Sequence, residues 1–172
     1  MDLSNLTNEE IKALCLEKKI GAKELTDNGI CPTCFNREYD GCVFGDDTDK
    51  TIYSDENFEV FLVGNPRCDG HAAISTKKHF KDMMELDPSL VAPIYELAQK
   101  LMITIRNVYG SESVYLCTMC DGPMNHFHIQ LIPRYSYEER GSDNFIKPRK
   151  EYVEDSEKIK ILRKELGYKS ND

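Results

Sequence analysis

The chain has 172 residues, enough for one domain with a sizeable core and appended segments. Its 30 acidic and 22 basic residues give a net charge of −8, which argues against binding nucleic acid through bulk charge. We find neither a signal peptide nor an apolar run near the roughly 18 residues of a membrane helix. With seven cysteines, this composition favours a cytoplasmic protein whose thiols serve metal binding or packing.

The first fifty residues begin with a clear helix signal. Residues 7–10 form a capping box ahead of apolar residues at helical spacing, so a short helix is predicted from about residue 8. Gly21 is predicted to end this helix. Residues 22–50 show no clean periodicity and are predicted to be irregular.

Two pairs of cysteines have metal-ligand spacing. Cys31 and Cys34 are separated by two residues, as in a zinc knuckle, and Cys117 and Cys120 repeat the spacing. A four-cysteine site is therefore one hypothesis. It is weakened because residues three apart on a strand face opposite ways, and Cys117 falls within a predicted strand. A site without Cys117 and Cys120, and no zinc at all, are the alternatives.

The middle of the chain reads as three strands, a long helix and a fourth strand. Residues 51–53 and 58–63 are predicted to form a hairpin, and residues 71–76 a third strand. An Asp–Pro pair then starts an amphipathic helix over residues 88–108, which a glycine ends. Residues 113–118 form the predicted fourth strand.

The most informative stretch is the predicted fifth strand, residues 125–132, in which polar and apolar residues alternate. Successive side chains of a strand point to opposite faces, so His126, His128 and Gln130 are expected on one face. The apolar residues between them are expected to face the core. Pro133 is predicted to end the strand.

The order of these elements predicts the fold class. Strands, one long helix and then two more strands indicate an α+β domain with an antiparallel sheet of about five strands. Residues 1–49 would hold the first helix and the cysteine pair, residues 50–135 the core, and residues 136–172 a C-terminal extension. That extension is predicted to be irregular until a last helix begins after Asp155.

Two motifs of this chain resemble the histidine-triad (HIT) superfamily. The run from His126 to Ile132 is similar to its signature of three alternating histidines, with Gln130 in the third position. Residues 66–79, which include a Gly–His pair, are similar to a second family segment. Together the resemblance covers about residues 50–135. Glutamine in the third position resembles the branch with galactose-1-phosphate uridylyltransferase and the diadenosine tetraphosphate phosphorylases.

The resemblance implies a nucleotide hydrolase or nucleotidyltransferase that acts on a dinucleoside polyphosphate or nucleotide conjugate. His128 would attack the α-phosphate and form a nucleotidyl-histidine, and Gln130 would donate a hydrogen bond to a phosphate oxygen. A carboxamide cannot protonate a leaving group near neutral pH, which favours phosphate leaving groups. The acceptor of the nucleotidyl group, water or a second phosphate, stays open.

The resemblance also implies a metal site and an oligomeric state. Zinc-bearing members use two cysteines and two histidines, which correspond here to Cys31, Cys34, His79 and His126. Zinc bound in this way carries no net charge and would be structural. A homodimer is expected by the same resemblance.

Four further residues are candidates for substrate binding, two asparagines and two arginines: Asn65, Asn125, Arg134 and Arg140. The sequence departs from the family pattern at Val63, where many members have a ribose-binding Asp or Asn, and at Gly122, where they often have Gln. Two alternatives stay open, and the departures at Val63 and Gly122 favour the first of them. One is a nucleotide-binding or sensor protein with little turnover, and the other is a zinc-stabilised interaction module.

Overall fold

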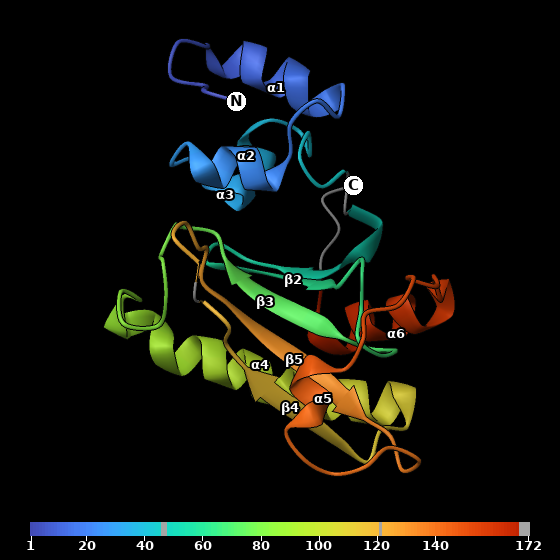
Figure 1. Ribbon diagram of the computed structural model, residues 1–172. Coiled ribbons are helices and arrows are strands. Elements are labelled where there is room, and N and C mark those ends of the chain that lie inside the picture. Colours follow the sequence, from blue (N-terminus) through green and yellow to red (C-terminus); the bar gives the residue numbers. More distant parts are fainter. Residues whose placement is uncertain (46–47, 121, 169–172) are drawn as a thin grey trace.

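A computed structural model of the chain describes residues 1–45, 48–120 and 122–168. The elements form three layers, with helices α1 to α3 on one side of a central sheet and helices α4 and α6 on the other (Figure 1). Among the described residues, no helix combines the length and apolar character needed to cross a membrane.

The sheet has five strands, and every neighbouring pair is antiparallel. Its order is β1-β2-β3-β5-β4, so the last strand in the sequence lies inside the sheet and β4 at its edge. The fold is therefore α+β with a five-stranded antiparallel sheet, as the element order predicts. The strands span Thr51–Ser54 (β1), Phe58–Leu62 (β2), Ala72–Thr76 (β3), Ser113–Cys117 (β4) and His128–Arg134 (β5).

Strand β5 differs from its predicted range. It begins at His128, three residues later than expected, and continues through Pro133, which pairs with Val114 of β4. The expectation that Pro133 ends the strand is wrong. Pairing between β5 and β3 stops at Leu131, so no β3 partner loses a hydrogen bond because proline lacks an N–H.

The long helix α4 spans Pro88–Tyr109 and has the predicted ends. The Asp87 carboxylate accepts a hydrogen bond from the N–H of Ser89, and Gly110 follows in the left-handed region at φ +68°. Helix α4 packs on the sheet together with α6, Ser156–Leu166, whose first turn is capped by the Asp155 carboxylate. The main hydrophobic core lies between these two helices and the sheet.

The N-terminal part contains more helix than the sequence predicts. Helix α1, Asn8–Leu16, has the expected capping box, with Thr7 as N-cap. Gly21 does not end this helix, because α1 has already stopped at Leu16; Gly21 instead precedes α2. Three further short helices occupy segments predicted to be irregular: α2 (Ala22–Asp27), α3 (Pro32–Glu38) and α5 (Asp143–Ile146), and a 3-10 turn, Thr48–Lys50, leads into β1. Helices this short carry too few turns to show a periodic pattern.

Helices α1 to α3 surround a second hydrophobic cluster, which is separate from the main core. Leu25 is fully buried in it, and Phe35 of α3 and Cys42 are nearly so. Residues 1–45, here called the N-terminal region, thus have a small core of their own and lie against the sheet face opposite α4 (Figure 1).

Candidate functional site

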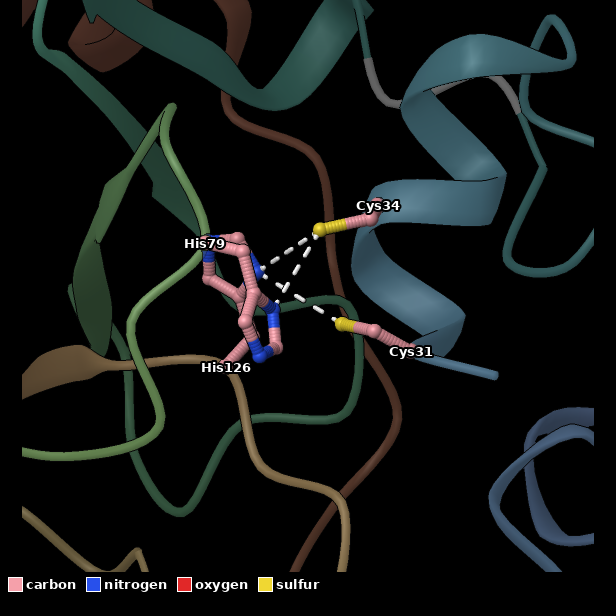
Figure 2. Close-up of side chains that lie close together, drawn as sticks. All are labelled: Cys31, Cys34, His79 and His126. Carbon is pink, nitrogen blue, oxygen red and sulfur yellow. Dashed lines mark hydrogen bonds between the residues drawn. The ribbon is translucent and has the colours of Figure 1, made fainter. Parts of the chain in front are cut away.

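Two cysteines and two histidines converge where α3 meets the sheet (Figure 2). Cys31 is the N-cap of α3 and Cys34 lies one turn further on, while His79 follows β3 and His126 precedes β5. The four ligand atoms, two Sγ and two ring nitrogens, lie within 4.8 Å of one another. The Nδ1 atom of His126 is 3.6 Å from Cys31 Sγ and 3.3 Å from Cys34 Sγ.

Hydrogen bonding orients His126 for metal binding. Its Nε2–H donates to the carbonyl of Thr76 at 2.6 Å, which leaves the Nδ1 lone pair directed at the two sulfur atoms. Burial lowers the pKa of His126 to about 4, so the ring is neutral, as a metal ligand must be. Burial also raises the pKa of the Cys34 thiol to about 12; a bound cation would have to displace that proton. The donor set therefore fits zinc in type and number.

The second cysteine pair takes no part in this cluster. Among the described residues, the group that could hold a metal consists of the two cysteines of α3 and two histidines. Cys117 lies instead on β4, opposite Gln130. The four-cysteine hypothesis is therefore not supported by the arrangement of the described side chains.

A chain of hydrogen bonds indicates which tautomer His128 adopts. The N–H of Arg67 donates to Nδ1 of His71 at 3.0 Å, so the proton of that ring is on Nε2, 3.2 Å from Oε1 of Gln130. The Gln130 amide nitrogen then donates to Nε2 of His128 at 3.3 Å, and Nδ1–H of His128 donates to the His126 carbonyl at 2.9 Å. His128 therefore presents a lone pair on Nε2.

His71 anchors this chain from within the protein. Its side chain is 1% exposed, and burial, followed by the nearby charge of Arg149, lowers its pKa to about 4. A neutral imidazole is the form that both of its hydrogen bonds require.

A cavity of about 1000 Å³ lies over the sheet face that carries His128 and Gln130. Its walls come from the sheet, the loop after β2, α3 with the loop after it, and the C-terminal extension. His126, His128 and Gln130 all line it, although His126 lies outside the strand. The volume lies at the upper end of the range for small-molecule sites, which suits a ligand as large as a nucleotide conjugate.

The structure brings only one of the four candidate substrate-binding residues to this cavity. Asn65 lines it, together with Val63. Asn125 instead hydrogen-bonds the backbone of Gly122 through both ends of its amide, at 3.2 and 2.9 Å. Its side chain therefore closes a local turn.

Arg134 and Arg140 also lie away from the cavity lining. Arg134 is 4% exposed and forms an ion pair with Glu112 at 2.7 Å, and Arg140 contacts the same carboxylate at 3.3 Å. The positive charge of both arginines is therefore directed at Glu112. Their position in the sequence, after the histidine motif, could not reveal this pairing.

The cations that do line the cavity are Arg37, Lys50 and Arg149, none of which the sequence singled out. Arg37 lies one turn after Cys34 on α3, so its place near the cysteine pair could have pointed to it. Arg149 belongs to the C-terminal extension, where no pattern pointed to it.

The sequence of this chain is similar to those of known proteins. Residues 45–137, more than half of the chain, match the HIT domain family. An uncharacterised HIT-like protein of Methanocaldococcus jannaschii is 30% identical over 106 residues, which cover 55% of this chain and 79% of that protein.

Solved structures share the fold. A zinc-bound histidine triad family protein from Mycobacterium smegmatis has a TM-score of 0.61 at 20% identity, covering 80% of this chain and 93% of that one. A diadenosine triphosphate hydrolase of Plasmodium falciparum has a TM-score of 0.56 at 16% identity, covering 73% and 81%. At these identities the likeness concerns the fold alone. The family match over residues 45–137, with the fold that accompanies it, identifies this chain as a member of the HIT domain family.

Proposed function

We propose that this protein is a nucleotide hydrolase or nucleotidyltransferase that cleaves its substrate at the α-phosphate through a nucleotidyl-histidine on His128. One observation carries the proposal: the Nε2 lone pair of His128 belongs to a half-buried ring on the wall of a cavity large enough for a nucleotide conjugate. The Plasmodium relative, named as a diadenosine triphosphate hydrolase, supports the same class of substrate.

In the first step, Nε2 of His128 attacks the α-phosphorus. A P–N bond forms as the P–O bond to the leaving group breaks, and the leaving phosphate departs as an anion that needs no proton. The ring then carries positive charge, and the hydrogen bond from its Nδ1–H to the His126 carbonyl stabilises that charge.

Gln130 has to release Nε2 of His128 before the attack. Its amide N–H, which donates to that nitrogen, is then free to donate to a non-bridging oxygen of the phosphate. His71 holds Oε1 of Gln130, so the amide keeps its N–H groups turned towards the reacting phosphate.

In the second step, an acceptor attacks phosphorus and the P–N bond breaks. Water must lose a proton in this step, whereas inorganic phosphate or a sugar phosphate is already an anionic nucleophile. Glutamine in the third position favours an anionic acceptor and supports the branch of galactose-1-phosphate uridylyltransferase and the diadenosine tetraphosphate phosphorylases.

The cysteine–histidine cluster is proposed to hold one structural zinc ion through Cys31, Cys34, His79 and His126. Two thiolates and two neutral imidazoles would balance the charge of the ion. The ion would link α3 to the segment that follows β3 and to the segment that precedes β5. A homodimer in the cytoplasm remains the expected state.

A second function, nucleotide binding with little turnover, is favoured by a specific observation. Val63 lines the cavity at the position where many members carry an acidic or amide side chain for the ribose. An apolar side chain there removes a contact that would position the substrate, and positioning contributes much of the rate in such reactions.

One experiment separates these readings. The protein is incubated with dinucleoside polyphosphates and nucleoside-diphosphate sugars, with and without inorganic phosphate, and products are separated by chromatography. Products without phosphate indicate a hydrolase, and products only with phosphate indicate a phosphorylase. Binding without any product indicates a binder, which would refute the catalytic proposal.

A further inference from the structure

The C-terminal extension is fastened to the edge of the cavity. The backbone N–H of Lys150 donates to the Pro66 carbonyl at 2.8 Å, and its ammonium group lies 2.7 Å from the Asp69 carboxylate. Arg67 donates to the Lys147 carbonyl. These contacts hold residues 147–150 against the loop that joins β2 and β3, so the extension forms part of the cavity wall.

Arg149 lies in the middle of this fastened segment and lines the cavity with His128 and Gln130. One of its terminal nitrogens, Nη1, donates to the carbonyl of Asn65 at 2.7 Å. That bond fixes the end of the side chain. The guanidinium has five N–H donors, and the described residues take up only this one by hydrogen bonding. The other donors remain available to a ligand.

The charge around Arg149 is unlike that around the other arginine of the cavity. Arg37 is 3.4 Å from the Glu59 carboxylate, which also lines the cavity. No carboxylate of the described residues forms an ion pair with Arg149, and burial, followed by the positive charge of Arg67, lowers the pKa of its guanidinium. A bound anion near Arg149 would offset the repulsion between these two positive charges.

We propose that Arg149 is a substrate-binding residue that holds a phosphate group beside His128 and Gln130. The inference rests on the proposed function and deepens it, because it assigns the positive charge that phosphoryl transfer needs to a residue outside the HIT domain match. The planar fork of arginine suits a phosphate oxyanion, to which it can donate two parallel hydrogen bonds.

The phosphate has two possible sources with the same chemistry: the nucleotide substrate itself, or an inorganic phosphate that accepts the nucleotidyl group. Binding of three kinds of probe to the full-length protein distinguishes them, measured by calorimetry: nucleoside monophosphates, the matching nucleosides, and inorganic phosphate alone. A site for the nucleotide discriminates monophosphates from nucleosides, and a site for the acceptor binds inorganic phosphate alone.

Two variants test the residue. Arg149→Gln is expected to weaken binding of the phosphate-bearing probe by about tenfold to a hundredfold, the effect of losing a charge-assisted hydrogen bond. Arg149→Lys keeps the positive charge but loses the planar guanidinium, so its affinity for the phosphate-bearing probe is expected to lie between those of the wild type and Arg149→Gln. Nucleoside binding should stay unchanged in both. Arg140→Gln is the matched control, because this exposed arginine pairs with Glu112 away from the cavity.

The outcomes separate this inference from the proposed activity. Arg149-dependent phosphate binding in a protein that turns over no nucleotide supports the inference and refutes the activity. Turnover together with equal phosphate affinity in wild type and Arg149→Gln overturns the inference and leaves the activity standing. A wild-type protein that binds no phosphate-bearing probe also overturns it. Thermal melting of each variant shows that the fold is retained.

Discussion

The main core, made of the sheet with α4 and α6, and the N-terminal region are held together in different ways. In the core, the sheet, α4 and α6 share one large hydrophobic cluster. The N-terminal region has a separate, smaller cluster and meets the core through directional contacts. Arg37 donates to the Lys77 carbonyl at 2.8 Å, and the cysteines of α3 approach two histidines of the core.

This difference indicates that the two regions depend on different kinds of interaction for their stability. Burial of apolar surface is additive over many residues, so the core does not depend on any single polar contact. The N-terminal region, in contrast, is positioned by a few side chains, and a metal ion in the cysteine–histidine cluster would be the strongest of these links. Because α3 forms one wall of the cavity, its position sets the shape of the cavity.

The largest expected effect tests whether the chemistry belongs to the core. His128→Ala should lower turnover by a factor on the order of 10³ or more, because the covalent route is lost. Nucleotide affinity should stay within about tenfold, and thermal stability should change little. Single-turnover kinetics and calorimetry measure these quantities. A variant that turns over at nearly the wild-type rate would exclude His128 as the nucleophile.

The next effect concerns the link between the two regions. Cys34→Ser should remove about one equivalent of zinc, determined by elemental analysis of protein made in zinc-replete medium. Hydrogen exchange should then accelerate in α1 to α3 and stay slow in the central strands. Cys117→Ser is the control and should change neither quantity. Full zinc content in the Cys34 variant would refute the site.

A pair of core substitutions sharpens the same comparison. Leu25 and Ile129 are both fully buried, the first in the N-terminal cluster and the second in the main core. Replacing either by alanine should cost about 2–5 kcal/mol. For Ile129→Ala the loss should appear in global unfolding by denaturant. For Leu25→Ala it should appear as faster hydrogen exchange confined to residues 1–45. Equal effects on both regions would show that they unfold as one unit.

The sequence predicted the core better than the N-terminal region for a physical reason. The helix over residues 88–109 is long, amphipathic and capped at both ends, and β2 alternates between buried and partly exposed residues, so local pattern and tertiary burial agree. Helices α2 and α3 are six and seven residues long, and their stability comes from packing on each other rather than from periodicity.

The residues of the candidate site also differ in how well the sequence predicted them. His128 and Gln130 lie on the strand that their motif indicated, and the four residues that the family resemblance implies as metal ligands lie close together. Arg134 was singled out by its position after the motif, yet its side chain pairs with Glu112. Arg149 reaches the cavity only because a distant segment folds back against the loop at Asn65, which no local pattern can reveal.

The smallest effect is a pH dependence of stability that comes from His71 in the core. Burial lowers its pKa from 6.5 to about 4, so the folded protein keeps this ring neutral where the unfolded chain would protonate it. Between pH 6.5 and 4 the unfolded state therefore binds more protons, and stability falls as the pH is lowered. The loss contributed by His71 should be at most about 3 kcal/mol below pH 4 and absent above pH 6.5.

His71→Gln isolates this contribution, because a glutamine amide can still donate to Oε1 of Gln130 but does not titrate. Urea unfolding of both proteins at a series of pH values measures the difference. The wild type should lose more stability than the variant between pH 6.5 and 4, even though His126, whose pKa burial also lowers, titrates in both. Parallel curves for the two proteins would mean that His71 has the same pKa in the folded protein as in the unfolded chain, so that burial does not keep the ring neutral. The hydrogen-bond chain that leaves Nε2 of His128 with a lone pair would then be interrupted below pH 6.5, since it begins with a neutral His71.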